Sequence, residues 1–373
     1  MGPTFVAILT GEGPGAVAVV RVWGVDAVGL AGRAFRPRSG PGLAATLEGR
    51  PRLGRVGDGI GDEVVALVVP GVAPEVEVHA HGGRAAIATV VAALIAEGAE
   101  RADPSAWHRH SAPSRIRAEA LDDLPRAATL RAARHLLDQA GGALDGELAL
   151  VRQALAARPD EATRRVDRLL DEARVGLRLV PGWRVVLAGR PNVGKSRLLN
   201  ALVGYDRAIV DPTPGTTRDV VAARTAIDGW PVELADTAGL RATADPIEAA
   251  GIDRARASQR RADLVVLVLD RSEPLADQDH ALLAEYPDAM VVANKADLPG
   301  VWDRGGPVVS AERGDGIEAL IAAIGRRLVP APPPGGAPLP FRPRHVRGLA
   351  AVRRAIVGGD AGRADRTLAR RLS

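Results

Sequence analysis

The stretch Gly189-Arg-Pro-Asn-Val-Gly-Lys-Ser196 follows an apolar run, Trp183–Ala188, and precedes a segment rich in leucine. Two glycines five positions apart, followed by lysine and serine, are typical of a phosphate-binding loop between a strand and a helix. In such a loop the backbone N–H groups surround a phosphate, and the helix N-terminus adds its dipole. The stretch therefore predicts a nucleotide-binding α/β domain with a parallel sheet.

The composition makes the lysine of this loop unusual. The chain of 373 residues is long enough for about two or three domains. It is 46% hydrophobic and 25% charged. Of the 49 basic residues only Lys195 and Lys295 are lysines. A compact ammonium suits the β- and γ-phosphates better than a planar guanidinium does, which explains why Lys195 is kept. Because arginine replaces lysine almost everywhere, the high basic content alone is weak support for nucleic-acid binding.

The composition excludes several classes of protein. The chain has no cysteine, which rules out disulfides, thiolate catalysis and cysteine-bound zinc or iron–sulfur sites. It has no apolar run of the ~18 residues that a membrane helix needs, and no secretory signal is visible. We therefore expect a cytoplasmic protein without a membrane partner.

Two further motifs supply groups for the phosphates and a metal ion. Asp236-Thr-Ala-Gly239 follows an apolar run and would place a carboxylate near Mg²⁺ and a glycine amide near the γ-phosphate. Gly215-Thr-Thr-Arg-Asp219 lies between the loop and this motif, and its hydroxyls could complete the metal shell. The hydroxyl of Ser196 is the remaining metal ligand expected from the loop.

A fourth motif predicts that the base is guanine. Asn294-Lys-Ala-Asp297 follows another apolar run, and Asp297 can accept hydrogen bonds from guanine N1 and N2, which adenine does not offer. Asn294 can tie the base to the phosphate loop, and the stem of Lys295 can cover the ring. Ser310 and Ala311 would present a backbone N–H to guanine O6. The four motifs and the residues next to them predict that GTP contacts Asn192, Val193, Gly194, Lys195, Ser196, Arg197, Gly215, Thr216, Thr217, Asp236, Thr237, Ala238, Gly239, Asn294, Lys295, Asp297, Ser310 and Ala311.

Changes in composition and hydrophobic pattern along the sequence predict five segments. These are a small α/β domain at 1–112, a helical region at 113–178, the nucleotide-binding domain at 179–329, a Pro/Gly linker at 330–340 and a basic helical tail at 341–373. Strands are expected at 4–9, 16–22, 63–69, 75–79, 183–188, 232–235, 264–269, 290–293 and 307–309, and a helix at 84–96. Gly141, Gly142 and Pro159 are expected to interrupt the helical region.

The motifs resemble those of the tRNA-modifying GTPases that act on wobble uridine, the MnmE or TrmE family. The sequences GRPNVGKSRLLNAL, GTTRD, DTAGLR, IEAAGI and NKADL carry the resemblance, and residues 13–21 and 77–83 are similar to the N-terminal domain of that family. The resemblance implies an α/β multidomain fold. A P-loop GTPase domain, a parallel sheet with flanking helices, is inserted in a helical domain and follows a small α+β folate-binding-like domain.

The resemblance also implies a catalytic apparatus. Family members hydrolyse GTP with K⁺ in place of an arginine finger, and their GTPase domains dimerise. Leu240 stands where other GTPases carry a water-orienting glutamine, and Glu248 matches the family's substitute. The implied catalytic residues are Glu248 and Lys195, the implied K⁺ ligands are Asn192, Asp211, Thr213 and Thr216, and the implied Mg²⁺ ligands are Ser196, Thr217 and, through water, Asp236.

Further cofactors and partners are implied by the same resemblance. Arg21 and Glu77 match contacts to a tetrahydrofolate derivative, and the implied partners are a second copy of the chain, a flavoprotein and tRNA. The family's C-terminal cysteine motif has no counterpart here. This departure keeps open a second hypothesis, a GTP-dependent switch or RNA/ribosome-assembly factor without modification chemistry. In that case the tail, with nine arginines against two aspartates, would bind RNA or a partner.

Overall fold

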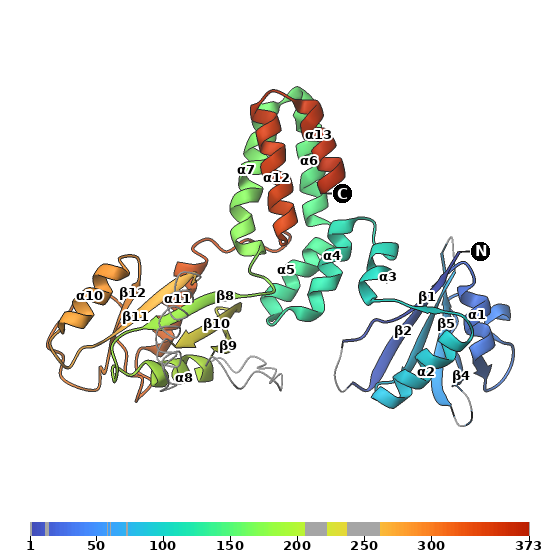
Figure 1. Cartoon of the computed structure of the whole chain (residues 1–373), viewed down its shortest axis with the longest axis horizontal. Helices are drawn as coiled ribbons and strands as arrows, with labels where there is room; N and C mark the ends of the chain where they lie inside the picture. The colour runs from blue at the N-terminus through green and yellow to red at the C-terminus, as the bar shows by residue number, and fades with distance from the viewer. Residues whose placement is uncertain are drawn as a thin grey trace, which may run out of the picture. The chain divides into compact units, whose positions relative to one another are not determined.

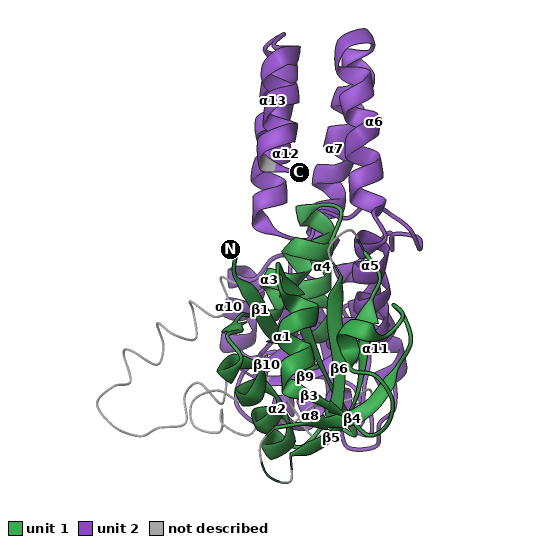
Figure 2. Ribbon diagram, turned by 90° about the vertical axis from the view of Figure 1, so that its right-hand side faces the viewer, with its two compact units in different colours: residues 1–125 green, residues 126–373 purple. Residues whose placement is uncertain are grey.

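The computed structural model describes residues 2–11, 15–57, 59, 61–71, 74–205, 222–236 and 262–372. The chain forms two compact units, Met1–Pro125 and Arg126–Ser373, drawn in green and purple in Figure 2. The first unit extends past residue 112, where the sequence places a domain boundary, so the division into five segments stays a prediction. Within the described ranges no helix is both long and apolar enough to cross a membrane.

The first unit contains a seven-stranded sheet in the order β3-β4-β5-β6-β2-β1-β7 (Figure 1). All neighbouring strands are antiparallel except β1 and β7, which are parallel. The strands are β1 (Thr4–Ile8), β2 (Val17–Gly24), β3 (Phe35–Pro37), β4 (Arg52–Val56), β5 (Asp62–Val69), β6 (Glu75–His81) and β7 (Glu100–Arg101). The helices are α1 (Ala27–Ala34), α2 (Arg84–Ala96), α3 (Pro104–Ser111) and α4 (Arg115–Asp123), with short 3₁₀ turns at Leu43–Ala45 and Leu124–Arg126.

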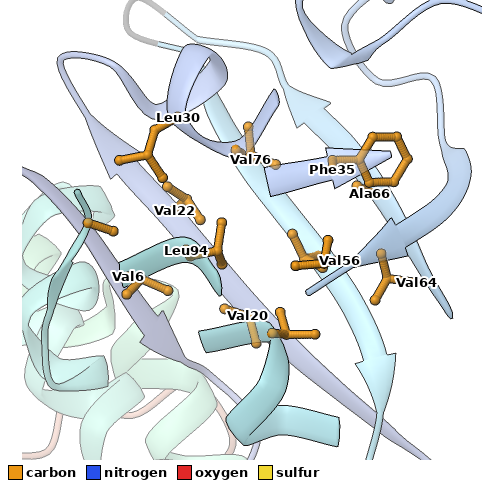
Figure 3. Packing of buried hydrophobic residues seen from close by; sticks show 14 of the residues in the cluster. Val6, Val20, Val22, Leu30, Phe35, Val56, Val64, Ala66, Val76 and Leu94 are labelled. Carbon is orange, nitrogen blue, oxygen red and sulfur yellow. The ribbon is translucent and has the colours of Figure 1, made fainter. Parts of the chain in front are cut away.

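The core of this unit lies between the sheet and helices α1 and α2. Alternate residues of the strands, such as Val20 and Val22 of β2, point to the helices and are buried, as the two-residue period of a strand requires. Leu30 of α1 and Leu94 of α2 pack against them (Figure 3). The helix expected at 84–96 is confirmed, and four of the seven strands lie where the sequence predicts strands.

The second unit holds a five-stranded sheet in the order β12-β11-β8-β10-β9. Strands β12, β11, β8 and β10 are parallel, whereas β9 pairs antiparallel with β10. The elements are β8 (Trp183–Ala188), α8 (Lys195–Tyr205), β9 (Ala222–Ile227), β10 (Trp230–Asp236), β11 (Leu264–Asp270), α10 (Asp277–Glu285), β12 (Met290–Asn294) and α11 (Ile317–Leu328). The parallel strands are continuous apolar runs because both faces of the sheet are covered. Their carboxyl ends therefore share one edge of the sheet.

One predicted strand of this domain is wrong. The segment 307–309 forms no strand, because only Val308 pairs with β12, through an isolated bridge to Ala293. Two hydrogen bonds hold it there, from Ala293 N to Pro307 O and from Val309 N to Ala293 O, each 2.9 Å. A single bridge is still enough to bring the residues after Val309 to the edge of the sheet.

The helical part of the second unit combines segments from both sides of the domain that holds the five-stranded sheet. It comprises α5 (Leu130–Ala140), α6 (Ala143–Ala157), α7 (Pro159–Gly176), α12 (Pro343–Val357) and α13 (Ala361–Arg371). The breaks expected at Gly141, Gly142 and Pro159 are confirmed. Helix α12 packs against α7 and α13, and α13 packs against α6 (Figure 1). An ion pair between Arg152 Nε and Asp365 Oδ1, 2.5 Å apart, joins α6 to α13.

Helix α5 contacts the hairpin that connects β9 to β10. The ring of Trp230 stacks on His135, with centroids 5.6 Å apart, and the Arg131 guanidinium lies over the same indole. Arg131 Nη1 also lies 3.0 Å from Asp228 Oδ2. Burial lowers the pKa of His135, so the stacked imidazole is neutral at pH 7. These contacts anchor the strand that ends at Asp236 to the helical part.

The segment predicted as a linker, 330–340, is held against α5 by a buried amide. Gln139 is fully buried, and its Nε2 donates to Ala337 O at 2.9 Å while its Oε1 accepts from Leu339 N at 3.1 Å. Next to it, Asp138 Oδ2 accepts from Gly336 N at 2.9 Å. Among the described residues, the segment has no neighbouring strand to pair with its backbone. The amide of Gln139 supplies hydrogen-bond partners for its backbone groups instead.

We expect Gln139→Leu to lower the free energy of unfolding by about 2–4 kcal/mol, because it leaves the Ala337 carbonyl and the Leu339 N–H buried without partners. Urea titration followed by circular dichroism measures the change. The matched control is Gln153→Leu on α6, whose side chain is exposed and which should change the stability by less than about 0.5 kcal/mol. Equal effects at the two positions would show that the amide does not hold the segment.

Candidate nucleotide-binding site

The loop 189–194 connects β8 to α8 through three residues with positive φ. Gly189 has φ +148°, Asn192 +65° and Gly194 +95°. A Cβ on Gly189 would collide with the carbonyl oxygen of Val268, and one on Gly194 with the side chain of Asn294. Both glycines are therefore required by the backbone conformation and by the close approach of neighbouring strands. The resulting curl is the geometry that phosphate-binding loops use.

The side chain of Lys195 lies inside this loop. The residue is 6% exposed, and its ammonium donates to Gly189 O at 3.0 Å and Arg190 O at 2.8 Å. The ammonium is thus enclosed by the backbone whose N–H groups would surround a phosphate. Such an enclosed point charge is the arrangement expected for a group that contacts β- and γ-phosphates.

The two predicted Mg²⁺ ligands that the structure describes are in contact. Ser196 Oγ donates to Asp236 Oδ2 at 2.8 Å, and Asp236 is 4% exposed. The contact follows from the fold, because Asp236 pairs in register with Leu187, two residues before Gly189. Carboxylate and hydroxyl oxygens are ligands that Mg²⁺ prefers. The third expected ligand, Thr217, lies outside the described residues.

Asn294 connects the phosphate loop to the segment after Val309. Its side chain is buried; Nδ2 donates to Val193 O at 2.8 Å and Oδ1 accepts from Ala311 N at 3.0 Å. The residue is the last of β12, so the strand itself sets the position of both contacts. The sequence-based expectation that Asn294 ties two parts of the site together agrees with this geometry.

Lys295 pairs with an aspartate that no sequence motif predicts. Its Nζ lies 2.5 Å from Asp270 Oδ2, and its backbone has φ +65°. Burial alone would raise the pKa of Asp270, but hydrogen bonds from Lys295 and Ser272 outweigh it, so the pKa lies below its usual value. The ionised carboxylate therefore fixes the lysine. The sequence did offer a signal for Asp270, because it ends a buried apolar strand in the same way as Asp236 does.

Asp297 is held by the hydroxyl of Ser310. Ser310 Oγ donates to Asp297 Oδ1 at 2.6 Å and accepts from Arg313 N at 3.1 Å. The hydrogen bond from Ser310 lowers the pKa of Asp297, which keeps the carboxylate ionised and able only to accept. The amides predicted to face guanine O6 are both engaged, since Ser310 N donates to Asp315 O and Ala311 N to Asn294 Oδ1. Ser310 thus orients the carboxylate through its side chain.

The remaining predicted residues of this site lie at its rim or outside the described chain. Within the loop the side chain of Val193 is buried and that of Asn192 is exposed, and Arg197 forms an exposed ion pair with Glu312. Outside the described residues lie Asp211, Thr213, Gly215, Thr216, Thr217, Thr237, Ala238, Gly239 and Glu248.

The two residues matched to folate contacts face each other in the first unit. Arg21 of β2 pairs in register with Glu77 of β6, and their side chains form an ion pair. The guanidinium also lies 3.4 Å from Glu75 and stacks on Trp107, 4.8 Å from the ring centroid. Arg21 Nε is buried and has no partner among the described residues, which leaves one donor for a ligand. No cluster of metal-binding side chains occurs in the part of the chain that the structure describes.

Two protein families match separate parts of the chain. Residues 184–295 match the family described as 50S ribosome-binding GTPase, and residues 4–111 match the family described as GTP-binding protein TrmE N-terminus. The first match spans β8 to β12 and so includes the phosphate loop, Asp236 and Asn294. The second covers the sheet of the first unit.

Characterised relatives match across both units. The tRNA modification GTPase MnmE of Symbiobacterium thermophilum is 38% identical over 87% of this chain and 82% of its own length. The proteins of the same name from Chloroflexus aurantiacus and Geobacillus kaustophilus are each 36% identical, over 95% and 86% of this chain and 88% and 81% of their own lengths. Among solved structures, the G domain of the T. maritima FeoB iron transporter is 28% identical over 40% of this chain and 97% of that domain, with a TM-score of 0.30.

The sequence relatives, matched over most of both lengths, decide the family. The geometry of the phosphate loop, the Ser196–Asp236 pair and the carboxylate of Asp297 agrees with that assignment. The chain belongs to the MnmE family of tRNA modification GTPases, and it is a GTPase.

Proposed function

We propose that the protein uses GTP hydrolysis to support modification of the wobble uridine of tRNA. The observation that carries this proposal is the match to relatives named tRNA modification GTPase over 81% to 88% of their length. The first unit matches the N-terminal domain of the same family, so the likeness is not limited to the GTPase domain. In this function the protein would act with a flavoprotein and tRNA, as a dimer in the cytoplasm.

Recognition of guanine is assigned to the carboxylate of Asp297. An ionised carboxylate accepts two hydrogen bonds from guanine N1 and N2, and Ser310 holds one of its oxygens in place. The aliphatic stem of Lys295 covers the base while Asp270 fixes its ammonium. Asn294 aligns this half of the site with the phosphate loop through Val193.

Binding of the phosphates is assigned to the loop, Lys195 and a magnesium ion. Ser196 and Asp236 fit Mg²⁺ because their oxygens lie together at the carboxyl edge of the sheet, and Thr217 would complete the set. When bound, Mg²⁺ neutralises charge on the β- and γ-phosphates. Lys195 supplies a fixed positive charge in the loop, so both groups would stabilise the negative charge that develops on the phosphates.

Activation by K⁺ is assigned to Asn192, with Asp211, Thr213 and Thr216. The amide of Asn192 suits a cation because it is exposed at the loop. When bound, K⁺ supplies positive charge where other GTPases use an arginine finger. Glu248 would orient the attacking water, since Leu240 has no hydrogen-bonding group.

A folate derivative is assigned to the first unit. The buried Nε of Arg21 offers a donor, and the Arg21–Glu77 pair together with Trp107 provides charged and aromatic surface for a pterin-like ring. The first unit would also provide a dimer contact, as the family resemblance implies.

A second candidate function is a GTP-dependent switch or RNA-assembly factor without modification chemistry. The observation that favours it is the absence of cysteine from the 373 residues, because the resemblance implies a cysteine in the modification step. The GTPase site is the same in both candidates, so tests of the site do not separate them.

The function itself is tested by the modification state of wobble uridine in tRNA from a strain lacking this gene. We expect the modified nucleoside to disappear from digests analysed by mass spectrometry, and to return when the gene is restored. A Lys195→Ala gene is the matched control, because it removes the phosphate contact and should not restore the modification. Unchanged modification in the deletion strain would favour the switch.

Replacing Asp297 should change the base that is bound. We expect Asp297→Asn to weaken GTP binding by about 100-fold or more, because two charge-assisted hydrogen bonds to guanine are lost. The same variant should bind xanthosine triphosphate better than the parent does, since its amide donates to the carbonyl at C2. Calorimetry measures both affinities, with Asp288→Asn, an exposed aspartate on the same domain, as the control. Undiminished GTP affinity would remove Asp297 from the base site.

Hydrolysis should depend on the monovalent cation. We expect GTP turnover to be at least about tenfold faster in KCl than in NaCl. The reason is that K⁺ fits the proposed site better than Na⁺ does and so supplies positive charge next to the phosphates. Asn192→Ala should abolish the difference while GTP affinity stays close to that of the parent. The rate of phosphate release at saturating GTP is the measurement.

Glu248→Ala provides the contrast to Asn192→Ala, because a water-orienting group acts whichever cation is present. It should lower the turnover number about 100-fold in either salt. Equal rates of the parent in the two salts would refute the potassium assignment.

A further inference from the structure

A pocket between α12 and α13 is lined by arginine side chains. Arg354 comes from α12, and Arg363, Arg366 and Arg370 come from α13, with the hydroxyl of Thr367 among them. The pocket has a volume of about 430 Å³, and its four arginines are exposed. The remaining lining consists of two alanines of α12, so the walls carry positive charge only.

Within the described part of the chain, no carboxylate pairs with these four guanidinium groups. The acids of α13 are engaged elsewhere: Asp365 pairs with Arg152 of α6, and Asp360 caps the helix by accepting from the Arg363 N–H at 2.7 Å. The helical part thus neutralises other arginines, including Arg353 with Asp167, and leaves this group uncompensated. Four like charges around one pocket repel one another, and a bound anion would relieve that repulsion.

The arginines form a row. Arg363, Arg366 and Arg370 are spaced i, i+3 and i+7, which places them on one face of α13 along about 10 Å of helix. Arg354 faces the row from α12. A single phosphate would bind one or two of these guanidinium groups, whereas a row of them suits a ligand that presents several phosphates in succession.

We propose that this pocket binds consecutive phosphates of an RNA strand, an inference that rests on the proposed function in tRNA modification. Arginine pairs bidentately with phosphate oxygens, and Thr367 adds a hydroxyl donor of the kind that contacts nucleic-acid backbones. The pocket has no aromatic side chain to stack on a base, so binding is independent of sequence. The same lack disfavours an acidic protein, because a protein interface needs aromatic or large apolar anchors.

The test measures tRNA binding by the full chain with Arg366→Gln and Arg370→Gln combined. We expect the dissociation constant for an unmodified tRNA transcript to rise about tenfold near 0.1 M KCl, as two exposed charge contacts are lost. The slope of log K against log salt concentration should become shallower by about one to two. Fluorescence anisotropy across a KCl series gives both values. Arg366→Lys combined with Arg370→Lys should keep the slope of the parent, because the charges remain.

The matched control is Arg164→Gln combined with Arg168→Gln. Both side chains are exposed on α7 and lie outside the pocket, so the variant loses the same net charge. It should bind tRNA as the parent does, and GTP hydrolysis without RNA should be unchanged in every variant. Thermal unfolding verifies that the pocket variant is folded.

Three results would overturn the inference. Unchanged tRNA affinity of the pocket variant is the first, and equal weakening by the α7 control is the second, because it would reduce the effect to net charge. The third is displacement of tRNA from the parent by poly-glutamate at an equal concentration of charge, which would assign the pocket to an acidic protein. None of these results bears on wobble-uridine modification in the deletion strain, which tests the proposed function separately.

Discussion

The two halves of the nucleotide site are joined by one buried side chain, the amide of Asn294. Its donor holds the carbonyl of Val193 in the phosphate loop, and its acceptor holds the N–H of Ala311 in the segment that orients Asp297 through Ser310. A buried amide whose donor and acceptor are both bonded fixes the relative position of the two loops, because a shift of either loop would leave a polar group without a partner. The same side chain lies against Gly194, which is why that position has no room for a Cβ.

The fold makes this junction possible by ending four parallel strands at one edge. β8 leads into the phosphate loop, β10 ends at Asp236, β11 ends at Asp270 and β12 ends at Asn294. Each strand is an apolar run that packs on both faces, so the sheet fixes the side chains that follow it. The contacts of Trp230 with α5 extend this order to the helical part, at the opposite end of the strand that carries Asp236.

Much of this site could be predicted from the sequence because the residues involved belong to short motifs that directly follow strands. The spacing of Gly189, Gly194 and Lys195 predicts a phosphate loop, and the structure has one. The pairing of Lys295 with Asp270 was missed because it joins residues that are distant in sequence and belong to no common motif. The amides after Val309 were assigned to the base, yet both bond within the protein.

The fold shows a similar division. Long apolar strands and the helix 84–96 could be predicted, whereas β3, β4, β7 and β9 were missed. β3 and β7 have only three and two residues, and β4 carries two arginines and a glycine among its five residues. These strands are therefore defined by their neighbours rather than by their own patterns. The 330–340 segment looks like a free linker in sequence, but the distant side chain of Gln139 orders it.

We propose that one amide, that of Asn294, aligns the phosphate and base halves of the site. The most direct test is calorimetric binding of GDP to Asn294→Ala, beside Asn200→Ala, an exposed asparagine on α8. Loss of two buried hydrogen bonds should misalign the halves and weaken GDP binding by about 30-fold or more, while Asn200→Ala keeps the affinity of the parent. GDP affinity of Asn294→Ala equal to that of the parent, in a folded protein, would show that this amide does not align the two halves.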